Sequence, residues 1–168
     1  PVYFKTTGTG NPGTFSSSLY SEQTGIVLTE VFMSSVGWGD LDNDGYLDIV
    51  HSGYVGSGNT FTKAYRNNRD NTFTEQTGIS FPDHHYTAGI VDYDNDGDLD
   101  ILLINSDHVI HDNFMVFGNN GDGTFTGQTP VPLGYTVSSA ASGDYDNDGY
   151  IDIIMTGKSS DAPVTRIY

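Results

Sequence analysis

The chain repeats itself with a constant period, and this feature constrains its fold more than any other. Three segments are plain copies of one another: GDLDNDGYLDIV from Gly39, VDYDNDGDLDIL from Val91 and GDYDNDGYIDII from Gly143. Their first aspartates, Asp40, Asp92 and Asp144, follow one another at intervals of 52 residues. A constant period of this length indicates one supersecondary unit stacked on copies of itself. We therefore expect one repeat domain over residues 1–168, with repeats at about 3–64, 65–116 and 117–168.

Each period reads as a set of short strands. Apolar runs rich in β-branched residues lie at 47–50, 99–104 and 151–155, and shorter runs follow at 62–65 and 114–117. Clusters of Asn, Asp and Gly after the shorter runs predict turns. No segment carries a helical period with a cap. About four short strands per repeat is typical of a propeller blade, so the sequence predicts an all-β fold of three propeller-type blades. A three-turn β-solenoid is the alternative, although solenoid repeats are normally shorter.

Each copy also contains a nine-residue acidic loop with carboxylates at positions 1, 3, 5 and 9 and a glycine at position 6. In loop 1 (residues 40–48) the carboxylates are Asp40, Asp42, Asp44 and Asp48. In loop 2 (residues 92–100) they are Asp92, Asp94, Asp96 and Asp100, and in loop 3 (residues 144–152) Asp144, Asp146, Asp148 and Asp152. Position 7, which is Tyr46, Asp98 or Tyr150, is expected to contribute its backbone carbonyl.

This spacing predicts a metal site, because four carboxylates held close together repel one another unless a cation neutralises them. Hard oxygen ligands on a sharply turning loop favour Ca²⁺ over zinc or iron, and Mg²⁺ is disfavoured by its demand for a tight octahedron. We therefore expect three calcium ions per chain. An EF-hand is excluded, because position 12 is His51, Leu103 or Met155 instead of glutamate and the flanking segments read as strands.

The overall charge excludes several partners. Asp and Glu number 22 against 6 Lys and Arg, for a formal net charge of −16. Such a surface repels phosphate, so we expect neither nucleic acid nor anionic membranes as partners. No apolar run approaches the roughly 18 residues of a membrane helix, so we expect no membrane insertion. There is no cysteine, which excludes thiol catalysis and zinc–thiolate sites.

The acidic loop, the apolar strand after it, and the Tyr-x-Asn-Asn and Gly-x-Phe elements at 65–73 and 117–125 together resemble the FG-GAP/VCBS repeats of integrin-α-like β-propellers. The resemblance covers nearly the whole chain and implies a loop that joins the first two strands of a blade and binds calcium. It also implies a secreted or cell-surface, non-enzymatic protein with a structural or adhesive role. A calcium-dependent lectin and the non-catalytic domain of a larger secreted enzyme are the alternatives.

Three blades cannot close a ring, since closed propellers generally have four to eight. An open arc leaves strand edges free at both ends. The chain is therefore expected to be part of a longer propeller, to close a ring with a second copy, or to add head to tail into a filament. Its expected partners are neighbouring blades or other copies of itself, joined through N- and C-terminal strands, with glycans or cell-surface proteins as further candidates.

Four histidines and three aromatic residues could suggest further binding sites, but we expect structural roles for them. His84, His85, His108 and His111 are expected to be exposed loop residues and not a transition-metal site. Trp38, Tyr93 and Tyr145 could stack on a sugar, but an aromatic residue beside a strand more often packs in the core.

Overall fold

The structure is a computed structural model, and it describes residues 4–6, 20–57, 59–82, 86–105, 113–160 and 162–168. The four histidines at 84, 85, 108 and 111 lie outside this part of the chain. The described residues form strands and contain no helix, which confirms the all-β prediction.

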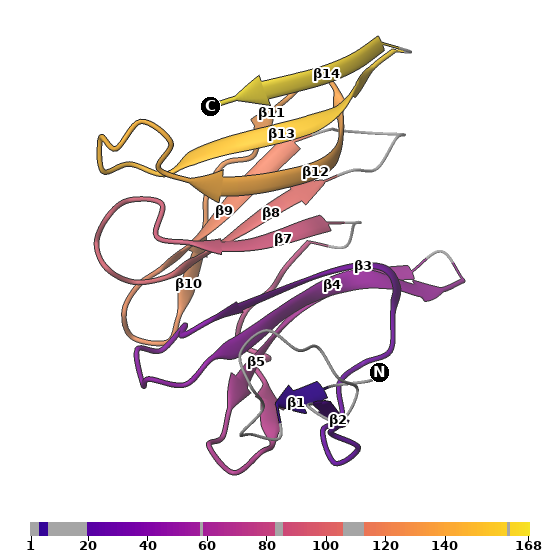
Figure 1. The fold of residues 1–168 in the computed structure, drawn as a ribbon, viewed down its shortest axis with the longest axis vertical. Coiled ribbons are helices and arrows are strands. Elements are labelled where there is room, and N and C mark those ends of the chain that lie inside the picture. Colours follow the sequence, from indigo (N-terminus) through magenta and orange to yellow (C-terminus); the bar gives the residue numbers. More distant parts are fainter. Residues whose placement is uncertain (1–3, 7–19, 58, 83–85, 106–112, 161) are drawn as a thin grey trace.

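The strands form three main antiparallel sheets (Figure 1). Sheet I consists of β3 (Phe32–Gly39), β4 (Asp48–Gly56), β5 (Asn59–Asn67) and β6 (Phe73–Glu75). Sheet II consists of β7 (Tyr86–Val91), β8 (Asp100–Asn105), β9 (Asn113–Asn119) and β10 (Phe125–Gly127), with β11 (Val131–Pro132) also paired to β9. Sheet III consists of β12 (Thr136–Gly143), β13 (Asp152–Ser159) and β14 (Ala162–Ile167). A separate hairpin pairs β1 (Phe4–Thr6) with β2 (Tyr20–Glu22).

Sheets I and II follow the same plan, in which four strands run in sequence order across the sheet. This is the expected number of strands per repeat. The sequence repeats at 65–116 and 117–168 begin inside β5 and β9, the third strands of sheets I and II. Each of these repeats therefore contributes strands to two sheets. The antiparallel pairing inside each sheet argues against the solenoid alternative, in which successive turns pair in parallel.

The sheets are stacked face to face, and alternation along the strands divides the core into layers (Figure 1). Val50 of sheet I packs with Ile101 and Leu103 of sheet II. The intervening Leu102 and Ile104 point the other way and pack with Met155 of sheet III. The second strand of sheet II is therefore buried on both faces, which explains its unbroken apolar run.

Glycine allows sheets I and II to approach closely. A Cβ atom on Gly39 would lie 2.6 Å from Cγ2 of Ile90, which is too close for two carbon atoms. The glycine just before loop 1 therefore serves sheet packing and lets Ile90 reach the first core layer.

Candidate metal sites

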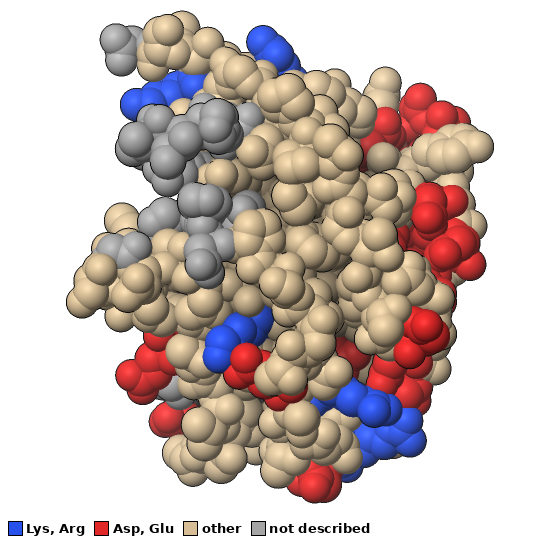
Figure 2. Space-filling model, turned by 180° about the vertical axis from the view of Figure 1, so that it is seen from behind, with Lys and Arg blue, Asp and Glu red and all other residues tan. Residues whose placement is uncertain are grey.

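The three acidic loops occupy equivalent places in the fold. Each connects the first and second strands of a sheet: β3 to β4, β7 to β8 and β12 to β13. Because the sheets are stacked in the same orientation, the loops lie in a row along one edge (Figure 1). From the back, acidic atoms gather along this edge, and Lys and Arg atoms adjoin its lower end (Figure 2).

The backbone of each loop turns in the same way. The residue at position 4 has a left-handed conformation, with φ of 55° at Asn43 and 60° at both Asn95 and Asn147. Asparagine tolerates this region better than most residues. Gly45 and its two equivalents follow with φ of 86–94°. The pattern explains why Asn-Asp-Gly occurs in every copy.

Hydrogen bonds inside the loop fix the first carboxylate. Asp40 Oδ1 accepts from the backbone N–H of Asp44 at 2.9 Å, and Oδ2 accepts from that of Gly45 at 2.7 Å. Asp144 accepts from Asp148 and Gly149 in the same way. The chain thus curls around the position-1 carboxylate, which brings the following odd positions toward it.

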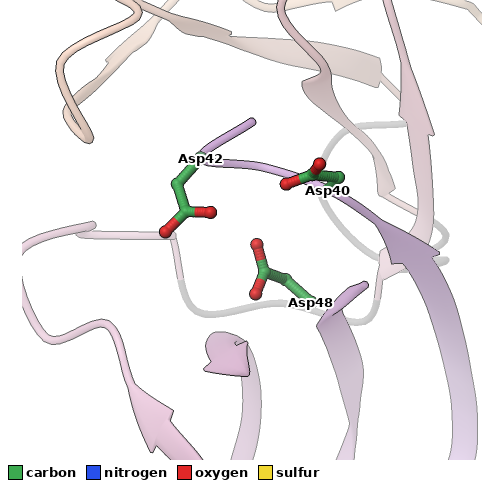
Figure 3. A group of neighbouring side chains, drawn as sticks. All are labelled: Asp40, Asp42 and Asp48. Carbon is green, nitrogen blue, oxygen red and sulfur yellow. The ribbon is translucent and has the colours of Figure 1, made fainter. Parts of the chain in front are cut away.

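The curl gathers three carboxylates in each loop. One oxygen from each side chain lies within 4.8 Å of the others in three groups: Asp40, Asp42 and Asp48; Asp92, Asp94 and Asp96; and Asp144, Asp146 and Asp152. The side chains of the first group point toward a common centre (Figure 3). Positions 1 and 3 are shared by all three groups, whereas the third member is position 9 in loops 1 and 3 and position 5 in loop 2.

Two buried oxygens in these groups have no hydrogen-bond partner, namely Asp42 Oδ1 and Asp92 Oδ1. Asp42 Oδ2 also lacks a well-oriented hydrogen bond, but it forms an ion pair with Arg66 Nε at 2.6 Å. A buried carboxylate oxygen without a partner is costly unless a cation or water satisfies it. The all-oxygen donor set therefore fits Ca²⁺, which takes six to eight oxygen ligands in flexible geometry.

The carboxylate at position 9 also fastens the loop to the sheet. Asp48 Oδ2 accepts from Leu41 N at 2.9 Å and Oδ1 from Asn67 N at 2.8 Å. Asp100 repeats both bonds, with Tyr93 N at 2.9 Å and Asn119 N at 2.7 Å. Burial raises the pKa of Asp48 and of Asp100, and these backbone hydrogen bonds oppose the shift. Position 9, at the start of the second strand, therefore joins the beginning of the loop to the third strand.

Contacts between neighbouring loops were not foreseen from the sequence. Asn43 Nδ2 donates to Asp98 Oδ1 of loop 2 at 2.5 Å, and Asn95 Nδ2 donates to the carbonyl of Gly149 in loop 3. Asn119 Nδ2 donates to the carbonyl of Leu41 in loop 1 at 2.8 Å. The side chain of Asp98 thus bridges two loops, in addition to the carbonyl role expected for position 7. The sequence feature that could have predicted these contacts is the asparagine at position 4 of all three loops.

The expectation for the aromatic residues was wrong. Trp38, Tyr93 and Tyr145 are exposed and not core residues. Trp38 contacts Phe73 edge to face, with ring centroids 6.4 Å apart, but more than half of its surface remains accessible.

The fold and the loops together define a β-rich repeat protein with one acidic loop per sheet. Residues 92–155, from the first aspartate of loop 2 to Met155 of β13, match the family described as FG-GAP-like repeat. The match confirms, over these residues, the resemblance to FG-GAP repeats inferred from the sequence. No match was found among curated proteins or among solved structures. Within the described residues, no helix is both long and apolar enough to cross a membrane.

Proposed function

We propose that the chain is a calcium-binding, propeller-type repeat module of an extracellular protein, with a structural or adhesive role and no catalytic activity. The observation that carries this proposal is the threefold recurrence of carboxylate oxygens within 4.8 Å of one another on equivalent loops. The proposed ligands are the aspartates at positions 1, 3, 5 and 9, with the backbone carbonyl of position 7.

Calcium in these loops would act as a structural cross-link. The ion would supply positive charge where aspartates at positions 1 and 3 face a third carboxylate, and three ions would add six charges to the formal −16. Because position 9 already holds the second and third strands, a bound ion would connect the whole loop to the sheet. At a free concentration 100 times Kd, each site would add about 2.7 kcal/mol to the free energy of unfolding.

Thermal melting tests this proposal. The wild type should melt at a higher temperature in millimolar Ca²⁺ than in EGTA, and Mg²⁺ should restore little of the difference. Asp94→Ala removes a position-3 ligand of loop 2 and should reduce the calcium-dependent shift. Asp122→Ala, in the exposed β9–β10 turn outside the loops, is the control and should keep the full shift. Equal melting of the wild type in Ca²⁺ and EGTA would overturn the proposal.

The ends of the stack support head-to-tail assembly with a second copy. On the outer face of sheet III, the cross-strand partners Ile154 and Ile167 are 40% and 54% exposed. The corresponding pair in sheet II, Leu102 and Val116, is 3% and 8% exposed beneath the next sheet. At the other end, sheet I exposes Val36 and Trp38 on its outer face. We propose that the outer face of sheet III packs against sheet I of another copy, as sheets I and II pack within the chain.

An edge contact would accompany this packing. In sheets I and II a fourth strand, β6 or β10, pairs with the third, whereas the order in sheet III ends at β14. The β1–β2 hairpin of the neighbouring copy is the proposed source of a fourth strand for sheet III, by main-chain hydrogen bonding.

Blocking the two ends separately tests the assembly. Ile154→Lys and Trp38→Lys should each abolish filaments in light scattering, and a mixture of the two variants should form heterodimers through their intact ends. Val131→Lys, at an exposed apolar site of β11 in the middle sheet, is the control and should assemble like the wild type. A wild type that stays monomeric at high concentration in calcium would rule the assembly out.

A calcium-dependent lectin is the second candidate, because exposed tyrosines stand on or beside the acidic loops: Tyr46, Tyr93, Tyr145 and Tyr150. Aromatic faces of this kind can stack on sugar rings. Calcium-dependent binding on a glycan array, lost in Tyr145→Ala, would favour this function over a purely structural one.

A further inference from the structure

Loop 1 differs from the other loops because two arginines contact its carboxylates. Arg66 Nε lies 2.6 Å from Asp42 Oδ2, and its Nη2 lies 3.6 Å from Asp44 Oδ2. Arg69 donates to the same Asp44 oxygen from Nη2 at 2.6 Å and from Nε at 3.0 Å. The two guanidinium groups thus neutralise the carboxylates at positions 3 and 5 of this loop.

The arginines are held in place by their surroundings. Arg69 adopts φ of 67°, its N–H donates to Asn67 Oδ1 at 2.9 Å, and its guanidinium lies 5.1 Å from the ring centroid of Tyr46. Arg66 lies on β5, next to the residue that bonds Asp48. Both side chains are half-exposed, but the side chain of Asp44 between them is 8% exposed.

The internal repeat provides the comparison. The residues 52 positions after Arg66 and Arg69 are Gly118 and Gly121, which have no side chain to offer. Loop 2 carries a fifth aspartate, Asp98, at position 7. Among the described residues, Lys and Arg form ion pairs with loop 1 and Glu75, and with no aspartate of loops 2 or 3. Loop 1 therefore has four carboxylates with two cations, and loop 2 has five carboxylates with none.

We propose that Arg66 and Arg69 are built-in counter-cations that make the first site unequal to the other two. Loop 1 keeps its conformation without calcium, since its carboxylates already have positive partners. It binds calcium more weakly than loops 2 and 3, because each guanidinium repels the incoming divalent ion. Calcium thus fills loops 2 and 3 first and loop 1 last. This inference rests on the proposed calcium binding.

The test removes the two charges and keeps a polar side chain at each position. In wild-type protein in EGTA, hydrogen-exchange mass spectrometry should show slower exchange in residues 40–48 than in residues 92–100 or 144–152. Calcium titration should resolve two tight sites and one site weaker by tenfold or more, since each cation about 6 Å from a divalent ion in water costs about tenfold in affinity. Arg66→Gln with Arg69→Gln should tighten the weak site by tenfold or more and speed apo exchange in loop 1.

The matched control is Lys63→Gln with Arg166→Gln, which removes the same charge outside the loops, at cations that face Glu75 and the ring of Tyr135. It should leave the weak site and loop 1 exchange unchanged. Three sites of equal affinity in the wild type, or equal apo exchange in all three loops, would overturn the inference and leave the proposed function standing. Absence of calcium binding at every loop would overturn both.

Discussion

Asn43 and Asp98 are 55 residues apart in sequence, yet Nδ2 of the first donates to Oδ1 of the second at 2.5 Å. The bond joins loop 1 to loop 2, and the bond from Asn95 to Gly149 joins loop 2 to loop 3. The position-4 asparagines thus connect the acidic loops into one continuous structure. Ordering one loop should therefore favour the order of the next.

Replacing Asn43 should weaken this coupling. Asn43→Gly keeps the left-handed backbone accessible and removes the amide, so the variant should unfold about 0.5–1.5 kcal/mol more easily in calcium, the usual value of one hydrogen bond. Its calcium titration should also be less cooperative than that of the wild type. Asn147→Gly is the matched control, because its backbone is equally left-handed and loop 3 has no later loop among the described residues. If both variants lose the same free energy of unfolding, the loss comes from the turn and not from the bond between loops.

Asp100 should be important for stability even without metal. Its carboxylate is buried and accepts from two backbone N–H groups, those of Tyr93 and Asn119. Asp100→Ala would leave both donors without a partner, so the free energy of unfolding in EGTA should fall by about 2–4 kcal/mol. Asp146→Ala, at an exposed position of loop 3, should change it by less than about 0.5 kcal/mol under the same conditions. Urea unfolding monitored by tyrosine fluorescence measures both, and equal effects would contradict this role of Asp100.

His51 should make stability depend on pH. It lies in β4, buried near the ring of Phe61, and burial lowers its pKa below the ordinary 6.5, with the charge of Lys63 acting in the same direction. The unfolded chain therefore takes up the proton at a higher pH than the folded chain. Stability should be full above about pH 6.5 and fall as the pH drops from there toward the folded pKa.

His51→Leu should remove this dependence, since the equivalent residues Leu103 and Met155 are buried apolar side chains. The difference in melting temperature between pH 7.5 and pH 5.5, measured in EGTA, should be smaller in the variant than in the wild type. If the variant and the wild type show the same difference in melting temperature, a group other than His51 causes the pH dependence.

The sequence predicted the features that depend on local pattern. Comparison of one copy with the next is enough to find the 52-residue period, the all-β class and the aspartates at odd positions of each loop. Strand lengths were underestimated: β4 continues to Gly56 through Ser52, Gly53 and Tyr54, because pairing with β3 and β5 stabilises residues of weak strand preference.

Long-range features could not be predicted in the same way. The contact of Arg69 with Asp44 depends on how the β5–β6 turn folds back over loop 1, and spacing along the chain does not determine this. The exposure of Trp38 depends on which face of sheet I is left uncovered. Both follow from the stacking of the sheets.

Isothermal titration calorimetry with Ca²⁺ tests the central claim most directly. The wild type, stripped of metal, should bind three calcium ions per chain, and Asp92→Asn with Asp94→Asn should bind two, because these replacements remove the shared ligands of loop 2 and leave loops 1 and 3 intact. A wild type that binds no calcium, or a loop 2 variant that still binds three ions, would contradict the account.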